Sequence, residues 1–427
     1  MLAAALIAAV NCGVHADVAG TLTVSDRSEV RLRLYQGETQ PGVDTVNAPG
    51  VRLDMAGERV SYSLAYSPSL TLVDMELGLD PLVFQTVSAG MSWLVARHFR
   101  LSLGEDASYG LQNYTFLTPT AAPTAVPGAP PPTTPTPALQ LLPGAETLLY
   151  GSSRSSATMQ LQAARHLQIA LLPSYFVGGG LDVASRDEIP RQNTPRLELD
   201  VTGILDRRDS LTTTVAATDT AFTSRPCDPT TGGDPTIASL ELTPNARCKP
   251  HNDLLEASEI WRGRLTRVDD LALFAGATGA HVRLDPGGDR EILFPTGGAT
   301  LIHHFHDEEG TRGEISVDVR VAPIIDVRFG TIDQRAQAVL ACKWKGPRST
   351  ITVGAGATES LPPTELGAVT YLGVSGEMLH ALGTDKRFEI GGGYRGAWQT
   401  QAPASPFFSN VFYAAFVYHE PALRLWP

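Results

Sequence analysis

The sequence has no long apolar segment. The longest unbroken apolar run is Leu2–Val10, whereas a helix needs about 20 apolar residues to cross a bilayer. We therefore expect no transmembrane helix. A run of this length suits the core of a signal peptide, and short residues precede Asp17 where a signal peptidase would cut. We assign residues 1–16 to a signal peptide, although the basic residues that usually precede such a core are missing.

Charge is scarce, and the basic excess of a nucleic-acid-binding protein is absent. Charged residues make up 18% of the chain, and 33 basic against 45 acidic side chains leave a formal charge of −12. No nucleic-acid partner is expected. The sequence also lacks a G-x-S-x-G elbow, a P-loop and any spacing that singles out a Ser-His-Asp set. We therefore predict no catalytic residue, no cofactor and no enzyme activity.

Cysteine is rare, with four in 427 residues. Cys227 and Cys248 bracket a stretch rich in Pro, Asp and Thr. In an exported protein a disulfide between them would close this loop and contribute about 3 kcal/mol. The alternative is a pair of unpaired loop cysteines. Cys342 stands alone in a strand pattern and is expected to be a small buried or lipid-facing side chain.

What the sequence has is period-two alternation, together with 40 glycines and 31 prolines. In Gly313–Val321, Ile315 and every second residue after it are β-branched and apolar, whereas the residues between them are polar. Side chains on a strand alternate between its two faces, so one face is apolar and the other ionic. The pattern recurs along most of the chain and predicts an all-β protein. A soluble sandwich and an outer-membrane barrel would both show it.

The connections between these segments favour the barrel. Short charged turns such as Arg97-His98 and Arg165-His166 alternate with long connections, which include the Pro-rich residues 118–137 and residues 223–254. This alternation is typical of an up-and-down barrel with turns on one side of the membrane and loops on the other. We predict that residues 17–427 form a single antiparallel transmembrane β-barrel of about 18 strands, in a range of roughly 16–20. Residues 284–312, interrupted by Pro and Gly, count as one strand or two.

The polar faces of the predicted strands carry more arginine than acid. The candidates for lining the lumen are Arg31, Arg33, Arg52, Arg100, Arg196, Glu198, Asp200, Arg262, Arg264, Glu314, Asp318, Arg320, Arg328 and Arg387. An arginine-lined lumen would favour anionic solutes, because guanidinium stays charged and pairs with carboxylate or phosphate. In the alternative, Arg–Asp and Arg–Glu pairs on neighbouring strands neutralise each other and hold the shape of the barrel.

One histidine cluster stands out, at His303, His304 and His306 before three acids. Two of these histidines would share a strand face and could contribute to a divalent metal site. The alternative is a solvated strand end, since no convergent ligand from elsewhere is evident. We assign no metal ligands.

The last strand, Asn410–Tyr418, carries Phe412, Phe416 and Tyr418 on one face. With the features above, the chain resembles bacterial outer-membrane β-barrel proteins, whose final strand carries spaced aromatic residues. It departs from them in continuing to Pro427. Its composition and strand number are also similar to the barrels of myxobacterial polysaccharide-secretion loci.

The resemblance implies an outer-membrane channel for a polar, in one version anionic, solute or polysaccharide. The implied partners are outer-membrane lipid and periplasmic export proteins. Three alternatives remain: a general small-solute porin, a non-transport barrel that anchors a surface or motility complex, and a secreted soluble β-sandwich that binds a ligand.

Overall fold

The computed structural model describes residues 19–35, 41–73, 81–113, 147–226, 247–285, 288–306, 312–326, 330–361, 369–401, 407–420 and 423–424. The signal peptide predicted at residues 1–16, the Pro-rich residues 118–137, Cys227 and Arg328 lie outside them. Within these residues no helix is long and apolar enough to cross a membrane.

Eighteen long strands make up a closed antiparallel barrel. The first half of the chain contributes β1 (Ala19–Tyr35), β2 (Gly42–Ala56), β3 (Val60–Leu72), β4 (Leu82–Ala96), β5 (Phe99–Asn113), β6 (Thr147–Ala164), β7 (Leu167–Gly180), β8 (Gln192–Ile204) and β9 (Asp209–Phe222). The second half contributes β11 (Arg247–Arg264), β12 (Asp269–Asp285), β13 (Gly288–His306), β14 (Arg312–Asp326), β15 (Thr331–Lys345), β16 (Ser349–Ser360), β17 (Val369–Leu382), β18 (Phe388–Gln401) and β19 (Phe407–His419). Three short pieces complete the described chain: β10 (Arg225–Pro226), β20 (Leu423–Arg424) and the helix α2 (Val183–Glu188).

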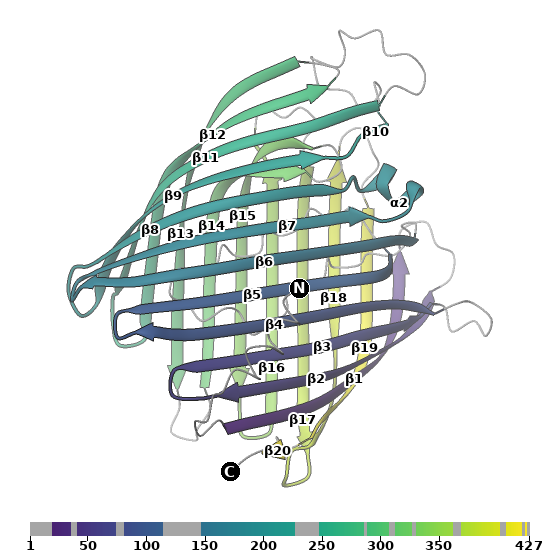
Figure 1. Cartoon of the computed structure of the whole chain (residues 1–427). Helices are drawn as coiled ribbons and strands as arrows, with labels where there is room; N and C mark the ends of the chain where they lie inside the picture. Colours follow the sequence, from purple (N-terminus) through teal and green to yellow (C-terminus); the bar gives the residue numbers. More distant parts are fainter. Residues whose placement is uncertain are drawn as a thin grey trace, which may run out of the picture.

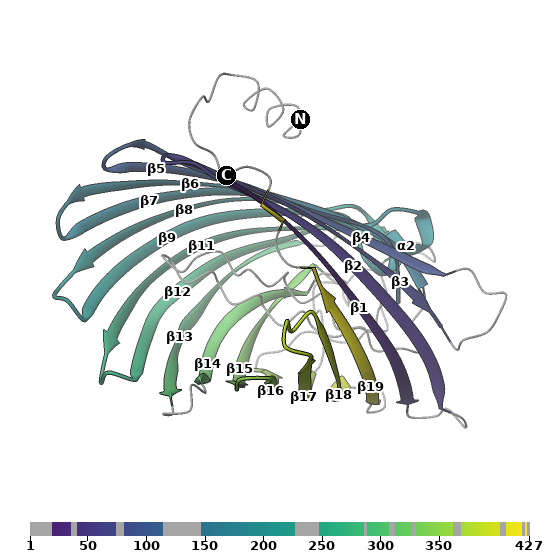
Figure 2. The same ribbon diagram turned by 90° about the horizontal axis from the view of Figure 1, so that it is seen from below.

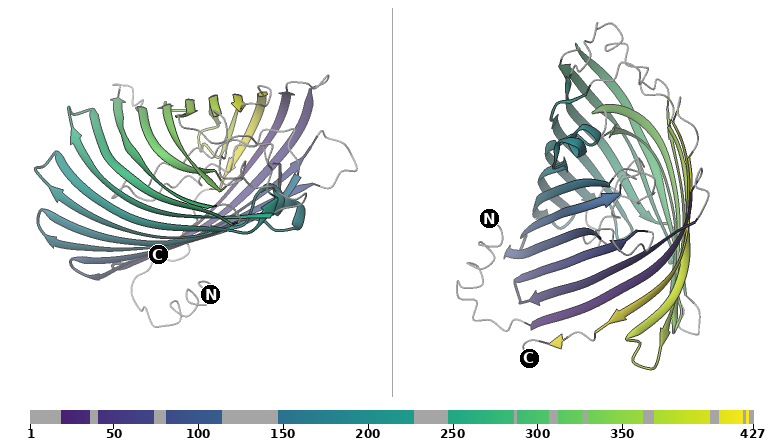
Figure 3. Two further views of the ribbon diagram at one scale, coloured as in Figure 1. Left: turned by 90° about the horizontal axis from the view of Figure 1, so that it is seen from above. Right: turned by 90° about the vertical axis from the view of Figure 1, so that its right-hand side faces the viewer.

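Each long strand pairs with its neighbours in the chain, and the last strand returns to the first. Ser25–Tyr35 of β1 pairs with Ser409–His419 of β19, and the same strand pairs with β2 on its other edge. Figure 1 shows β1 to β12 as one wall, in purple to green, with the strands from β13 to β19 crossing behind it. Figure 2 shows β19 beside β1, and Figure 3 gives the same ring from above and from the side. The predicted all-β, up-and-down barrel of about 18 strands is confirmed.

The apolar side chains of the alternating pattern lie on the outside. On β14, Ile315, Val317 and Val319 are 37–48% exposed, and on β19 Phe412 and Phe416 are 46% and 42% exposed. A barrel with so many exposed apolar side chains is stable only where lipid covers them. Rings on this surface pair across strands, with 5.1 Å between the centroids of Phe388 and Tyr418.

Two stretches that lack a clear alternation are strand in the structure. Strand β13 is a single strand that includes Pro295, and only residues 286–287 separate it from β12. Strand β11 begins at Arg247, so residues 247–254 of the connection predicted at 223–254 are strand instead. Both stretches carry polar or turn-forming residues on both strand faces, and this hid the period of two. The first residues of β11 pair with β12 and with β10.

Candidate channel wall

The polar face of the strands points into the barrel. On β1, Val30 and Leu32 are 50% and 40% exposed, whereas Glu29 and Arg33, on the alternate positions of the strand, are 3% and 5% exposed. Arg27 of β1 contacts Glu377 of β17, although β18 and β19 lie between these two strands. Side chains on alternate positions share a face, and side chains of non-adjacent strands converge on the concave side of a closed sheet. Glu29, Arg33 and their alternate neighbours therefore face inward.

A group of charged side chains covers the inner face where the barrel closes. We call it the seam cluster; its members are Arg27, Glu29, Arg31, Glu377, Arg395 and Tyr413. Glu29 lies at the centre, with Oε1 2.6 Å from Arg27 Nε and Oε2 2.7 Å from Arg31 Nε. Arg395 of β18 approaches the same carboxylate to 3.6 Å, across β19.

Glu377 and Tyr413 connect the seam cluster across the strands. The Tyr413 hydroxyl donates a hydrogen bond to Glu377 Oε2 at 2.9 Å, and the Arg395 guanidinium carbon lies 4.5 Å from the centre of the Tyr413 ring. Such cation–π contacts add attraction to that of the ion pairs. The cluster thus links four strands, β1, β17, β18 and β19, on the side facing the lumen.

A second charged group lies on β8 and β11. Arg196 is 2.8 Å from Glu198 on its own strand and 2.8 Å from Glu256 on β11. It also donates to Thr218 of β9, the strand between them, at 3.0 Å. Next along β8, the buried Asp200 accepts a hydrogen bond of 2.7 Å from Thr214. The arginine charge is compensated by two acids.

Most of the other predicted wall residues are also paired. The acid partner of Arg33 is Asp44 at 2.5 Å, that of Arg52 is Asp54 at 2.7 Å, that of Arg264 is Asp270 at 3.2 Å, and that of Arg320 is Asp318 at 2.7 Å. Glu314 lies 3.6 Å from His304. These contacts favour the interpretation in which wall pairs neutralise each other over an uncompensated arginine lining.

The remaining predicted residues lie as follows. Arg100 is the second residue of β5, and Arg262 shares its strand face with Glu256 on β11. Arg387 precedes β18 in a short connection, where it pairs with Asp385 at 3.0 Å rather than standing on a strand. Free Cys342 shares its face with the exposed Leu340, on the outside of β15. Cys248 is fully buried, and its pairing with Cys227 remains a prediction.

Sequence reasoning missed most of the seam cluster. Arg27 and Glu29 continue the period of Arg31 and Arg33 toward the N-terminus, so extending that alternation would have found them. Glu377 and Arg395 lie in glycine-rich strands without a clear apolar alternation. No local signal marks them, because their partners come from the other end of the chain.

Uncharged polar and small residues fill much of the inner wall between the charged groups. By strand alternation, the inward residues include Ser61, Ser63, Ser67 and Ser69 on β3, Thr212, Thr214, Thr218 and Thr220 on β9, and Gly354, Gly356, Gly373, Gly391 and Gly393 on β16 to β18. Hydroxyl groups both donate and accept hydrogen bonds. The wall can therefore bind polar groups of either kind weakly and repeatedly.

The predicted histidine cluster makes separate contacts with acids. His303 lies 2.7 Å from Asp269, and His304 lies between Asp270 at 3.4 Å and Glu314. Within the part of the chain that the structure describes, these side chains do not gather closely enough to share a metal ion. Their contacts are those of a solvated strand end.

Comparison with known proteins gives a family match over nearly the whole chain. The pattern of the EpsX exopolysaccharide export family matches residues 16–415, whereas no curated protein matches. Among solved structures, the chain is similar to Pseudomonas aeruginosa OpdO at 10% identity, covering 95% of this chain and 98% of that chain with a TM-score of 0.44. It is also similar to the ferric-catecholate import receptor Fiu of E. coli K12 at 9% identity, covering 93% of this chain and 81% of that chain with a TM-score of 0.45.

These structural similarities are too remote to assign a function. The family match and the closed barrel together identify an outer-membrane channel for polar solutes or polysaccharide. Soluble β-sandwich architecture is excluded by the closed ring of strands and its apolar exterior. This chain belongs to the EpsX exopolysaccharide export family.

Proposed function

We propose that this barrel is the outer-membrane exit for a polysaccharide, which crosses the lumen as a single extended chain. The observation that carries the proposal is the inner wall, where arginines are paired with acids and hydroxyl groups lie between them. A polymer passes through a pore only if each contact is favourable enough for entry and weak enough for release. Hydroxyl groups and compensated ion pairs supply such contacts to sugar hydroxyls and carboxylates.

The lumen-lining role of the twelve predicted residues that stand on described strands belongs to this proposal. In it, Arg196 and Arg320 present guanidinium groups that are already held by carboxylates, so an acidic sugar would exchange partners rather than bind a bare charge. The wall then accepts neutral and acidic polysaccharides alike. In this proposal a periplasmic export protein delivers the polymer to the lumen. The predicted signal peptide and the predicted Cys227–Cys248 disulfide fit the passage of this chain through an oxidising periplasm.

Planar-bilayer recordings test the channel. We expect stepwise currents with a reversal potential close to zero in a salt gradient, because the wall charges are balanced. Purified polysaccharide from the host, added on either side, should interrupt the current, and a deletion strain should lose surface polysaccharide. Absence of current together with unchanged surface polysaccharide would favour the anchoring alternative, and current without loss of polysaccharide would favour the small-solute porin.

A further inference from the structure

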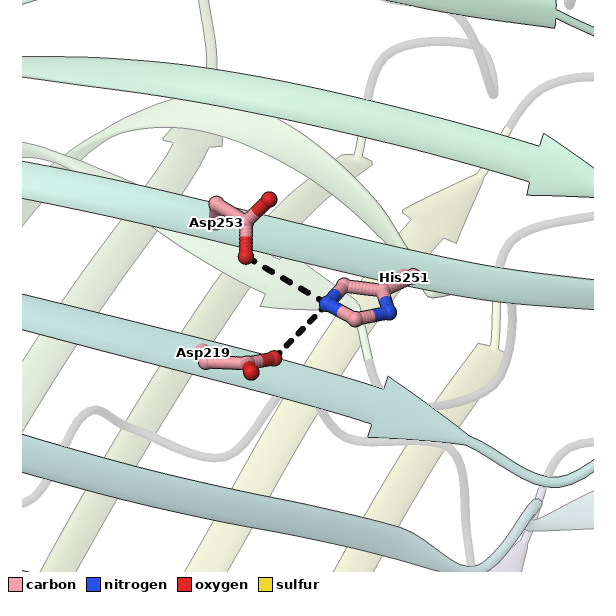
Figure 4. Close-up of side chains that lie close together, drawn as sticks. All are labelled: Asp219, His251 and Asp253. Atoms are coloured by element: carbon pink, nitrogen blue, oxygen red, sulfur yellow. Dashed lines mark ion pairs between the residues drawn. The ribbon is translucent and has the colours of Figure 1, made fainter.

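A histidine and two aspartates converge on the barrel at the ends of β9 and β11 that are remote from the short turns. His251 Nε2 lies 2.7 Å from Asp219 Oδ1 and 3.3 Å from Asp253 Oδ1. Figure 4 shows the imidazole between the two carboxylates, with the same nitrogen facing both. This nitrogen is shielded from solvent but makes no hydrogen bond of acceptable geometry. The arrangement brings three potential ligand atoms within 4.8 Å of one another.

The cluster lies on the outside of the barrel, away from the channel wall. His251 and Asp253 alternate with the exposed Leu255, so all three share one face of β11. Leu255 is 61% exposed, whereas Glu256 on the opposite face contacts Arg196 in the lumen. The site is therefore separate from the proposed path of the polymer.

The surroundings are acidic and supply a second layer of contacts. His281 of β12 lies 3.7 Å from Asp253 and 3.3 Å from Asp289 of β13. Among the described ion pairs, Arg283 is the one arginine on Asp253, at 2.8 Å. Among the described ion pairs of this outer surface, three carboxylates thus share a single guanidinium, and a bound cation would reduce the repulsion between them.

The donor atoms indicate the class of cation. One imidazole nitrogen and two carboxylate oxygens form a ligand set that suits zinc and related transition metals. Calcium and magnesium prefer oxygen ligands only. Carboxylate and histidine contacts behind a ligand, such as those of His281, are the kind that orient metal ligands.

We propose that Asp219, His251 and Asp253 form a binding site for a divalent transition-metal ion of the zinc class. The ion joins β9 to β11 on the outer surface of the barrel. His281 acts as a positioning residue for Asp253 and is not itself a ligand. The site is independent of the proposed export function, because none of its residues faces the lumen.

Zinc binding to the full-length barrel in detergent tests the site. The protein is stripped with a chelator and titrated with Zn²⁺ by calorimetry, and bound metal is counted by elemental analysis. We expect one equivalent per barrel, not displaced by excess Mg²⁺. His251→Gln should lose this equivalent, and His281→Gln should weaken it by about 10-fold. Heat-modifiable migration on gels shows whether each variant is folded.

His304→Gln is the matched control, because this histidine also lies between two acids but on the inner face near the short turns. It should retain the bound zinc. The proposal is overturned if the wild-type barrel binds no zinc, if folded His251→Gln binds as tightly as the wild type, or if His304→Gln loses the equivalent instead.

Discussion

Glu29 holds the seam cluster together, because its carboxylate pairs with arginines of two strands while only 3% of the residue is exposed. In Glu29→Gln, Arg27, Arg31 and Arg395 lose a shared counter-charge. We expect the free energy of unfolding to fall by about 1–3 kcal/mol and the reversal potential to shift toward anion preference. Urea unfolding in detergent and bilayer recordings measure the two effects.

The control for Glu29→Gln is Asp54→Asn, which removes an acid from a more exposed pair on the neighbouring strand. Exposed pairs contribute little, so this change should cost less than about 1 kcal/mol. An equal loss of stability in both variants would mean that Glu29 has no special place in the wall.

Asp182 makes the helix α2 sensitive to pH. Its carboxylate accepts hydrogen bonds from the backbone N–H and the hydroxyl of Ser185, and these bonds lower the pKa of Asp182 below its ordinary value. The stabilisation is therefore complete above the ordinary pKa and is lost as the pH falls through the lowered pKa.

Hydrogen exchange at the Ser185 amide, followed as the pH is lowered below 4, measures this effect on α2. The barrel strands should stay protected while the amide becomes labile. In Asp182→Ala this amide should have low protection from exchange at every pH, and high protection in that variant would mean that Asp182 does not hold the Ser185 amide.

Alternation within a strand assigns residues to the proposed channel wall but does not find their partners. Arg31 and Arg33 follow from alternation alone, since a strand needs only its own sequence to sort its side chains. Glu377 could not be found in this way, because it meets Arg27 across 350 residues of chain only once the barrel closes. Whether an arginine stands alone or paired is decided by such long-range contacts.

Two consecutive inward positions of β18 are glycines, Gly391 and Gly393, and neither has room for a side chain. A Cβ added at Gly393 would lie 2.4 Å from both the Gly376 carbonyl oxygen and the Tyr413 hydroxyl. Gly393→Ala should therefore displace Tyr413 from Glu377 and cost about 1–3 kcal/mol in unfolding free energy. Urea unfolding of the detergent-solubilised barrel measures the loss.

Gly356→Ala, on the inner face of β16, serves as the control for Gly393→Ala. Its new Cβ would meet no atom closer than 3.8 Å, so stability should change little. If both alanine variants unfold at the same urea concentration as the wild type, close packing of β18 against the seam does not constrain that strand.

At the level of elements, alternation predicted the strands whose two faces differ and failed where they do not. β14 shows it plainly, with valines outside and Asp318 and Arg320 inside. The start of β11 has histidine, asparagine and aspartate on both faces, since this part of the strand carries the outer His–Asp cluster rather than a lipid-facing surface. The proposed metal site thus replaces the apolar residues whose alternation would have predicted the start of β11.

The barrel architecture of the whole molecule could be predicted from sequence, because the alternation of short and long connections extends along the entire chain. That order, with apolar faces too numerous for a soluble core, implied a membrane barrel and its strand number. The pairing of β1 with β19 follows from the same order, because the first and last strands of an open sheet would each leave an edge without a partner. Whether the charges that line the lumen are paired could not be predicted, because that depends on contacts between strands far apart in the sequence.

The central claim is that the inner wall is the path of an exported polysaccharide. Thr352 faces inward on β16, opposite Glu377, whereas the next residue, Val353, is 48% exposed on the outer face. Each is replaced by cysteine in a Cys342→Ser background, and cells are treated with a bulky charged thiol reagent. Thr352→Cys should be modified and surface polysaccharide should fall, while Val353→Cys, covered by lipid, should stay unmodified with normal export. Modification of Val353→Cys alone, or full export through modified Thr352→Cys, would contradict this account.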